Sequence, residues 1–300
     1  MVKLTIHTAT YNRAYILSQA YESLKAQTCK DFEWIITDDG SNDGTDELVR
    51  RWIDNCEFFP IVYDQLPHVG LPRALNSGVQ KARSEWYMRL DSDDYLKSEA
   101  VEKILNWISE IEKDASFVGV GFARCFPDGR YMKNQTPVID PQVGYIDATN
   151  IERPKYRLDM DMCEASRVDL FKQFPFQAWT SETFAPEQLN YNEIALAGYK
   201  YRWRAEKLYV CQYLPDGQTR DDGLVKRNPM GFAMMHNQNM KIRKSFKEKC
   251  KCAMQMTALC IYAGHVRYLT KTNCFLATLI TFPLGIALSF RRQRQYAKIE

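Results

Sequence analysis

The segment that decides the fold is Tyr87-Met88-Arg89-Leu90-Asp91-Ser92-Asp93-Asp94-Tyr95, where an apolar strand ends in a cluster of carboxylates. Side chains alternate along a strand, so Asp91 and Asp93 point to the same side and bring two like charges together. Such carboxylates repel each other unless a proton or a cation lies between them. Hard oxygen ligands select Mg²⁺ or Mn²⁺, usually together with substrate phosphates. The pattern therefore favours a divalent-cation site at Asp91 and Asp93.

The same acidic segment has two other interpretations. Asp93 or Asp94 can cap the helix that we expect from Lys97 onward. An EF-hand calcium loop is excluded, because Tyr95 and Leu96 stand where a third ligand and the invariant glycine are required. On this segment alone, the helix cap and the cation site both remain open.

Two earlier predicted strands end in a similar way. The strand at 32–37 runs into Asp38-Asp39-Gly40-Ser41-Asn42-Asp43-Gly44-Thr45, and the strand from Leu4 to His7 runs into Thr8-Ala9-Thr10-Tyr11-Asn12-Arg13. Ligands of an open α/β sheet bind outside the carboxyl ends of its strands. Three successive strand ends with polar, acidic and aromatic residues therefore predict one binding cleft.

Strand and helix patterns alternate over the first 122 residues. Hydrophobic runs predict strands at 3–8, 32–37, 60–64, 85–90 and 116–122. Between them, apolar residues recur with the period of a helix. This alternation predicts an α/β fold with a mainly parallel sheet covered by helices. The first strand is not followed by G-x-G-x-x-G, and the chain has no Walker lysine loop, which argues against dinucleotide-binding and P-loop proteins.

The composition is that of an ordinary globular protein with a sizeable core, since 45% of the 300 residues are hydrophobic and 26% are charged. The nine cysteines never form a Cys-x-x-Cys pair, so neither a zinc site nor a thioredoxin motif is supported. The first residues, Met1 to Thr5, contain no apolar signal segment. We therefore expect a protein of the reducing cytosol.

The charge is distributed unevenly along the chain. Residues 236–300 contain twelve Lys or Arg and two Asp or Glu, a charge of +10, whereas the rest of the chain carries −7. This region also contains the longest apolar run, 274–290, which includes Pro283 and Gly285 and falls short of the roughly 20 residues that a membrane-spanning helix needs. The sequence predicts an acidic globular body with a basic, helical C-terminal extension.

Four motifs occur in order within the first 115 residues. They are Thr8-Ala9-Thr10-Tyr11-Asn12-Arg13-Ala14, Asp38-Asp39-Gly40-Ser41-Asn42-Asp43-Gly44-Thr45, Gly70-Leu71-Pro72-Arg73-Ala74-Leu75-Asn76-Ser77-Gly78 and Leu90-Asp91-Ser92-Asp93-Asp94. Together they closely resemble the inverting family-2 glycosyltransferases of GT-A fold. The chain departs from that pattern at Ala9, where many relatives have proline, and at Arg73-Ala74, where the order is exchanged. Beyond residue 125 the looser likeness suggests bacterial capsule or lipopolysaccharide sugar transferases.

The resemblance implies a nucleotide-diphosphate-sugar donor, with UDP as the nucleotide. Tyr11 would stack on the base, and Asp39 would accept a hydrogen bond from a uracil-type ring NH. Asp91 would contact the ribose and the metal, while Asp93 would ligate a Mn²⁺ or Mg²⁺ ion between the phosphates. Further donor-binding residues by motif position are Thr10, Asn12, Arg13, Arg73 and Asn76. Each of these residues, taken singly, also has an interpretation without a ligand. Tyr11 would then pack in the core, and Arg73 and Asn76 would lie on an exposed helix face.

An inverting transfer also needs a carboxylate beside the acceptor hydroxyl. Relatives commonly carry it as Glu-Asp at the start of a helix in the second half, a place taken here by 179–187 without such a pair. Glu182 lies in an expected loop beside Trp179, and Glu187 follows Pro186 in an expected first helical turn, where a carboxylate also favours the helix dipole. The resemblance leaves the base open between Glu182 and Glu187, with Asp161 after them.

The resemblance also suggests how the chain is organised. Residues 1–122 would form the nucleotide-sugar half of a GT-A domain, 123–215 the acceptor half, and 216–300 a basic helical region. The charge and the apolar run of that region predict contact with a membrane, with a helical cap packed on the catalytic domain as the alternative. The expected partners are a nucleotide sugar and a saccharide acceptor, lipid-linked on the cytoplasmic face of the plasma membrane. The apolar runs in the basic region suit lipid better than nucleic acid.

Two other functions compete with a sugar transferase. A sugar nucleotidyltransferase would open with a glycine-rich loop after the first strand, and Thr8 to Ala14 contain no glycine. A non-catalytic nucleotide-sugar-binding protein should have lost Asp91 or Asp93, and this chain has both. The sequence therefore favours a metal-dependent, inverting glycosyltransferase of surface polysaccharide biosynthesis.

Overall fold

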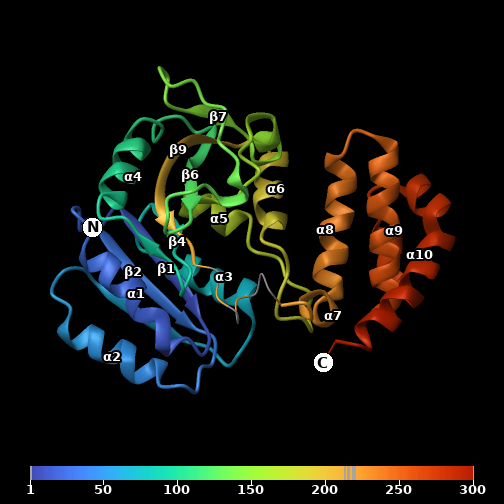
Figure 1. Cartoon of the computed structure of the whole chain (residues 1–300), viewed down its shortest axis with the longest axis horizontal. Helices are drawn as coiled ribbons and strands as arrows, with labels where there is room; N and C mark the ends of the chain where they lie inside the picture. Colours follow the sequence, from blue (N-terminus) through green and yellow to red (C-terminus); the bar gives the residue numbers. More distant parts are fainter. Residues whose placement is uncertain (1, 213, 215–216, 218–220, 300) are drawn as a thin grey trace. The chain divides into compact units, whose positions relative to one another are not determined.

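A computed structural model describes residues 2–212, 214, 217 and 221–299 (Figure 1). The chain divides into two compact units, of which unit 1 comprises 1–175 with 191–214, and unit 2 comprises 176–190 with 215–300. The domain boundary that the sequence predicts at 215/216 lies outside the described residues. The predicted assignment of donor and acceptor halves therefore stays a prediction.

Unit 1 is built on a sheet whose first four strands are parallel, in the order β3-β2-β1-β4. Figure 1 shows β1, β2 and β4 side by side. Leu4, Ile6, Trp34 and Ile36 are fully buried, which explains the apolar runs. The predicted strands are confirmed as β1 (Leu4–Thr10), β2 (Phe32–Asp38), β3 (Ile61–Gln65) and β4 (Trp86–Arg89).

Beyond β4 the sheet becomes mixed. β8 pairs antiparallel with both β4 and β6, and β9 then pairs parallel with β6. β5 and β7 complete the sheet as antiparallel partners of β9. The α/β prediction is confirmed, and the parallel pairing dominates its N-terminal half. The strands are β5 (Tyr95–Leu96), β6 (Phe117–Cys125), β7 (Ile146–Ala148), β8 (Met162–Arg167) and β9 (Lys200–Val210).

Helices follow the strands as predicted. In α1, Leu17, Tyr21 and Leu24 are buried, and the Tyr21 ring stacks on Trp52 of α2 with centroids 4.5 Å apart. The helices are α1 (Ala14–Lys25), α2 (Thr45–Asn55), α3 (Leu71–Lys81), α4 (Ala100–Ser109), α5 (Val168–Gln173) and α6 (Gln188–Leu196), with 3-10 turns η1 (Met132–Asn134) and η2 (Asn150–Tyr156).

The helix after the acidic segment begins later than Lys97. α4 starts at Ala100, and its N-cap residue is Glu99, which makes no side-chain capping bond. Neither Asp93 nor Asp94 therefore caps this helix. The capping interpretation of the acidic segment is wrong, because two residues of β5 and a further turn separate the carboxylates from the helix start.

Unit 2 is helical. Its buried core is rich in methionine and alanine and includes Met230, Met240 and Met256. The described elements are α7 (Leu224–Arg227), α8 (Pro229–Ile242), α9 (Phe246–Tyr262), the 3-10 turn η4 (Val266–Lys271) and α10 (Phe275–Tyr296). The final apolar run lies within α10, which continues without a break through Pro283 and past the run to Tyr296, 22 residues in all. By length and composition alone, α10 could cross a membrane.

Helix α3 approaches β1 closely at Gly78. A Cβ atom at Gly78 would lie 2.3 Å from Cε1 of His7, far inside van der Waals contact. His7 is fully buried and is held by the Tyr87 hydroxyl (2.7 Å from Nδ1) and the Thr37 hydroxyl (3.0 Å from Nε2). Because these bonds fix the ring, it has little freedom to move away from a larger residue. Burial, with help from Arg89, lowers the pKa of His7 to about 3, so the ring is neutral.

We predict that Gly78→Ala destabilises the protein. Alanine at a helix interior ordinarily stabilises by about 0.5–1 kcal/mol relative to glycine, but here overpacking against His7 should cost about 1–3 kcal/mol. Urea unfolding would measure the difference. Gln80→Ala, at an exposed position of α3, is the matched control and should change stability by about 0.5 kcal/mol or less. A more stable Gly78→Ala variant would show that the His7 ring relaxes.

Candidate active site

The parallel register brings the ends of three strands to one edge of the sheet. Thr10 of β1 pairs with Asp38 of β2, and His7 pairs with Arg89 of β4. The residues that follow these strands therefore emerge next to one another. We call them the strand-end cluster, which comprises Tyr11, Asn12, Asp39, Asp91 and Asp93.

Asp39 ties the end of β2 to the start of α3. Its carboxylate accepts hydrogen bonds from the backbone N–H of Val69 (2.6 Å) and of Gly70 (2.9 Å), and its own N–H donates to the Thr10 carbonyl (2.8 Å). Gly70 has φ 91°, a value that L side chains rarely adopt. A carboxylate has about four acceptor positions, so these bonds leave acceptor capacity on Asp39.

Tyr11 lies beside a residue that the sequence analysis did not single out. Its ring is 45% exposed and packs against His68, with centroids 4.3 Å apart and planes tilted by 31°. His68 Nδ1 lies 3.0 Å from the Asp39 carbonyl oxygen and 3.3 Å from the Asp39 carboxylate. The signal for His68 was its place two residues before Gly70, inside the loop that opens the third motif.

Asn12 and Asp43 join the loops after β1 and β2. The Asn12 N–H donates to the Ser41 hydroxyl (2.8 Å), and the Asn12 side-chain oxygen accepts from the Asn42 N–H (2.9 Å). Asp43 accepts from the first backbone N–H of two helices, Ala14 of α1 (2.9 Å) and Thr45 of α2 (3.2 Å). Partial burial alone would raise the pKa of Asp43. The hydrogen bonds from Thr45 and Ala14 outweigh it, so the pKa lies below its usual value.

The remaining predicted donor-binding residues flank these loops. Arg13 donates to the Tyr15 hydroxyl (2.6 Å), and Arg73 donates to the Val69 carbonyl (2.8 Å) at the start of α3. Arg73 and Asn76 are both partly exposed and lie three residues apart, on neighbouring positions of one helix face. Thr10, at the end of β1, is buried. Arg73 is therefore positioned in part by the same loop that Asp39 holds.

Asp91 sits between two arginines. Oδ1 accepts from Arg89 Nη2 (2.6 Å) and Oδ2 accepts from Arg124 Nη1 (2.7 Å). The guanidinium of Arg124 lies over the Tyr209 ring at 4.2 Å, and the Tyr209 hydroxyl accepts from the Asp91 backbone N–H (2.8 Å). Burial alone would raise the pKa of Asp91, but Arg89 and Arg124 hold it well below its usual range. Asp91 is therefore a fixed anion.

The three carboxylates of the acidic segment have different surroundings. Asp94 is buried, accepts from the Gln212 N–H (3.0 Å), and lies 3.7 Å from Arg124. Burial and then the charge of Asp91 raise the pKa of Asp94 to about 7. Asp93 is partly exposed between them in sequence. β4 ends at Arg89, and the Asp94 N–H donates to the Asp91 carbonyl (3.2 Å), so the acidic segment forms a turn in which strand alternation does not decide the direction of Asp91 and Asp93.

The match to a family model covers residues 5–174, more than half of the chain, and the family is described as glycosyl transferase family 2. The chain belongs to glycosyl transferase family 2. The α/β sheet and the order of the four motifs agree with this assignment, and the expected family is confirmed.

Relatives and solved structures agree with the family assignment. Chondroitin synthase of Pasteurella multocida is 31% identical over 59% of this chain and 16% of its own length. GalNAc(5)-diNAcBac-PP-undecaprenol beta-1,3-glucosyltransferase of Campylobacter jejuni is 31% identical over 37% of this chain and 36% of its own. The chain thus spans well under half of either relative. The structure of S. aureus TarS 1-349 with UDP-GlcNAc superposes with a TM-score of 0.59 at 13% identity, over 98% of this chain and 92% of TarS 1-349.

The family implies a divalent cation, and the acidic segment fits one only with help from a substrate. Among the described residues, no group of three or more His, Cys, Asp or Glu side chains has the arrangement of a metal site. Asp91 already uses both oxygens for arginines. Mg²⁺ is commonly held by one or two carboxylates together with substrate phosphates and waters. Asp91 and Asp93 as metal ligands therefore stay a prediction from the sequence.

The two candidate bases have different surroundings within unit 2. Both oxygens of Glu182 accept from the start of α8, from Met230 N–H and Gly231 N–H at 2.7 Å each. The side chain is buried, and burial raises its pKa against the effect of these two bonds. Glu187 is partly exposed and immediately precedes α6 rather than lying in its first turn. Glu182 therefore has an evident structural role at a helix N-terminus.

We predict that Arg124→Met destabilises unit 1 strongly. Removing Arg124 leaves Oδ2 of the partly buried Asp91 without its charged donor, while Arg89 still pairs with Oδ1, and should cost about 1.5–3 kcal/mol. Chemical denaturation followed by circular dichroism would measure the loss. Arg130→Met is the matched control, because Arg130 pairs with Asp128 on the surface with 63% of its side chain exposed. That change should cost about 1 kcal/mol or less, and equal losses in the two variants would contradict the prediction.

Proposed function

We propose that this protein transfers a sugar, with inversion, from a UDP-sugar to a saccharide acceptor in surface polysaccharide biosynthesis. The observation that carries the proposal is the strand-end cluster. It combines an exposed aromatic ring, a carboxylate with spare acceptor capacity and two acidic residues at adjacent ends of β1, β2 and β4. The UDP-GlcNAc bound to S. aureus TarS, a protein of the same fold, supports the choice of nucleotide.

The nucleotide base would bind at Tyr11 and Asp39. The 45% exposed Tyr11 ring offers a flat face for stacking. Asp39 is held rigidly by Val69 and Gly70, so an added hydrogen bond from a uracil ring NH orders no further side chain. A fixed acceptor of this kind rejects a base that lacks the matching donor, because the buried carboxylate then stays unpaired.

The diphosphate would lie against the acidic segment. A divalent cation, Mn²⁺ or Mg²⁺, would be held by Asp93 with Asp91 beside it, and it would neutralise the charge that develops on the leaving phosphate. Asp91 would orient the ribose, because Arg89 and Arg124 fix its carboxylate and keep it ionised. Arg13, Arg73 and Asn76 would complete the polar wall around the donor.

The acceptor hydroxyl needs a base on the side opposite the leaving group. We favour Glu187, because both oxygens of Glu182 already accept backbone hydrogen bonds at the start of α8. A base must reach the hydroxyl proton directly or through one water, which a carboxylate committed to a helix terminus does poorly. Glu182 remains the second candidate.

The acceptor would be lipid-linked, at the cytoplasmic face of a membrane. The Campylobacter jejuni relative has an undecaprenol diphosphate saccharide in its name, which supports an acceptor of this class. The basic C-terminal region supports peripheral membrane contact, since each Lys or Arg near an anionic leaflet contributes about 1 kcal/mol. An enzyme held at the bilayer surface would meet such an acceptor by diffusion in two dimensions.

We predict that turnover requires a divalent cation and Asp93. Asp93→Ala should remove nearly all UDP release from a panel of UDP-sugars tested with Mn²⁺, because the leaving phosphate would lose its neutralising charge. EDTA should abolish activity of the unchanged protein, and added Mn²⁺ should restore it. Circular dichroism would check that the variant is folded. Turnover that survives both EDTA and the substitution would refute the metal-dependent mechanism.

We predict that UDP binds far better than GDP or ADP. Calorimetry should give a preference of about 100-fold, in line with a fixed polar site that rejects an unmatched partner. Asp39→Asn should reduce that preference strongly. The ratio of affinities is the measurement, because losing the bonds to Val69 and Gly70 would weaken all nucleotides together. Equal affinity for the three nucleotides would contradict a uracil-type site, whereas dTDP shares the ring NH and is compatible.

We predict that one glutamate in the segment 182–187 is the base. Glu187→Gln should lower turnover by about 100-fold or more with UDP affinity unchanged, as expected for loss of a general base. Glu182→Gln should mainly lower stability, because one amide nitrogen would face a backbone N–H at the start of α8. The opposite result would assign the role to Glu182. If both variants turn over normally, the base lies elsewhere, and Asp161 would be tested next.

A further inference from the structure

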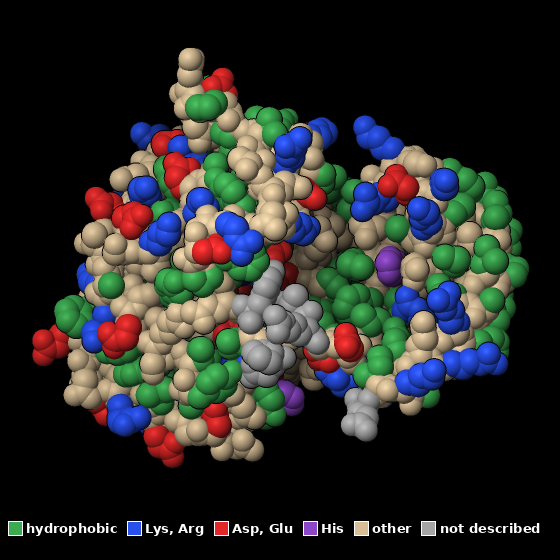
Figure 2. All heavy atoms as spheres, in the orientation of Figure 1, with side chains coloured by type: hydrophobic (Ala, Val, Ile, Leu, Met, Phe, Trp, Pro, Cys, Tyr) green, Lys and Arg blue, Asp and Glu red, His purple; other side chains and the backbone are tan. Residues whose placement is uncertain are grey.

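Helix α10 has its large apolar side chains on the outside. In a helix of a water-soluble unit, the large apolar residues ordinarily face the core. Here the buried positions are small or hydroxylated, and the large side chains are 56–71% exposed. Figure 2 shows apolar side chains gathered along the right-hand edge of the view, over α10. The buried set is Ala277, Thr278, Thr281, Gly285 and Ser289, and the exposed set is Phe275, Leu276, Leu279, Ile280, Leu284 and Phe290.

The small residues let α10 approach α9 closely. A Cβ atom at Gly285 would lie 2.6 Å from Cβ of Thr257, so only glycine fits this contact. The Thr281 hydroxyl donates to the Ala277 carbonyl within α10 (2.8 Å), which satisfies a buried polar group locally. Close packing through small and hydroxylated residues is typical of helices whose other face meets lipid.

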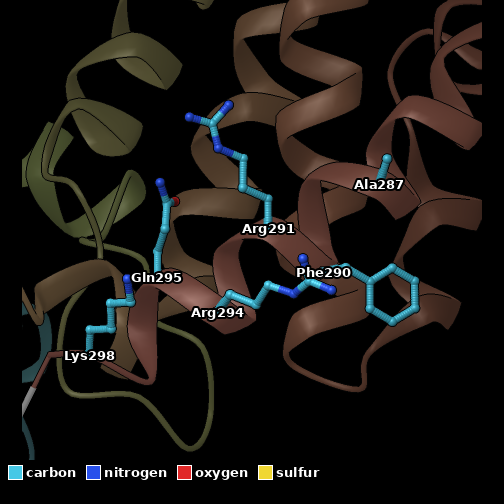
Figure 3. Close-up of a pocket in the computed structure, with 6 residues that line it drawn as sticks. All are labelled: Ala287, Phe290, Arg291, Arg294, Gln295 and Lys298. Atoms are coloured by element: carbon cyan, nitrogen blue, oxygen red, sulfur yellow. The ribbon is translucent and has the colours of Figure 1, made fainter.

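The same exposed face becomes basic toward the end of α10. A groove of about 430 Å³ runs along the helix there, lined by three cations and one amide beside two apolar residues (Figure 3). At 100° per residue, these positions continue the apolar face, whereas Arg292 points to the other side and bonds to Gln255 of α9. The lining residues are Ala287, Phe290, Arg291, Arg294, Gln295 and Lys298.

We propose that the outward face of α10, meaning the exposed apolar set and this groove, docks on an anionic phospholipid surface. Phe275, Leu279 and their neighbours would enter the boundary between headgroups and acyl chains. Arg291, Arg294 and Lys298 would bind a lipid phosphate, with Phe290 against the adjoining chain. The inference rests on the proposed membrane setting and names the surface and the class of lipid.

The length and packing of α10 favour a helix that lies on the membrane over one that crosses it. The apolar part, 275–290, would be about 24 Å long at 1.5 Å per residue, less than the roughly 30 Å of bilayer hydrocarbon. One side of the helix is also committed to α9, whose exposed residues include Lys251. The charged residues in the first turns of α9, Lys247, Glu248, Lys249 and Lys251, suit the interface and would be costly in the hydrocarbon.

A second copy of the chain fits this face less well than lipid does. A parallel pairing of two such faces would bring Arg291, Arg294 and Lys298 against the same cations. An antiparallel pairing would cover these cations with the Phe275 end of the partner, which desolvates charge without a counter-ion. An anionic lipid surface satisfies both the apolar and the basic part at once.

The test is flotation of the full chain with vesicles of phosphatidylcholine, alone or mixed with phosphatidylglycerol. Arg291→Gln/Arg294→Gln/Lys298→Gln should lower partitioning onto the mixed vesicles by about 100-fold. The matched control is Lys241→Gln/Lys244→Gln/Lys247→Gln, which removes the same charge from exposed positions near the start of α9. The control should lower partitioning by less than tenfold. Equal losses in the two variants would refute lipid binding at the groove, because they would show that partitioning depends on net charge alone.

A second matched pair tests the apolar part. Phe275 and Phe246 are both exposed phenylalanines at the first position of a helix, α10 and α9 respectively. Phe275→Asn should lower partitioning by about tenfold or more, because the protein would lose an aromatic side chain that the lipid buries. Phe246→Asn should leave partitioning unchanged. Equal effects of the two substitutions, or none from either, would overturn docking through α10.

Two further measurements separate this inference from its alternatives. Sedimentation without lipid should show a monomer, and a dimer that Phe275→Asn dissociates would replace the lipid with a second copy. UDP affinity should be the same in all α10 variants, and Asp93→Ala should float normally. A protein that binds UDP but never floats would refute the docking surface alone, whereas one that floats without binding UDP would refute the proposed activity.

Discussion

The charge of Asp91 is the constraint on which the arrangement of unit 1 depends. Its carboxylate is shared between Arg89 at the end of β4 and Arg124 on β6, while its backbone N–H reaches Tyr209 on β9. These three strands are far apart in sequence and belong to the parallel and mixed parts of the sheet. Removing either arginine from this partly buried carboxylate should cost about 1.5–3 kcal/mol. The same ionised carboxylate is therefore needed to join the sheet and to present the acidic segment.

Asp39 combines structural and functional roles in the same way. Its bonds to Val69 and Gly70 fix the loop that carries His68 and begins α3, and Arg73 reaches back to that loop. The base-binding side chains proposed here are thus held by hydrogen bonds that exist before any ligand arrives. Preorganisation of this kind reduces the ordering cost of binding. It also means that replacing Asp39 alters the shape of the site as well as its chemistry, so nucleotide preference is more informative than affinity.

Local patterns were sufficient for the first half of the fold and for most of the strand-end cluster. Periodicity placed β1, β2 and β4, and parallel pairing then brought Tyr11, Asp39 and Asp91 to one edge. Two partners of Asp91 could not be predicted, because Arg124 reaches it through the pairing of β8 with β4 and β6, and Tyr209 through the further pairing of β9 with β6. His68 was missed because its one local signal, its place two residues before Gly70, does not predict that the ring packs on Tyr11. The role of Glu182 was hidden likewise, since it depends on the start of α8 about 50 residues later.

The large apolar side chains of α10 take no part in the packing of its own unit, although the helix lies close against α9, and this gives the exposed face its physical meaning. To the buried core of unit 2, rich in methionine, α10 contributes Ala277, whereas its larger side chains stay outside. Fully burying one such side chain contributes about 1.5–3 kcal/mol of stability. In water these side chains stay exposed, so most of that stabilisation is missing. A lipid surface would recover it and would stabilise the packed position of α10 by mass action. The helix should therefore be held more firmly on the membrane than in solution, which makes the basic end of α10 a positioning device as well as an anchor.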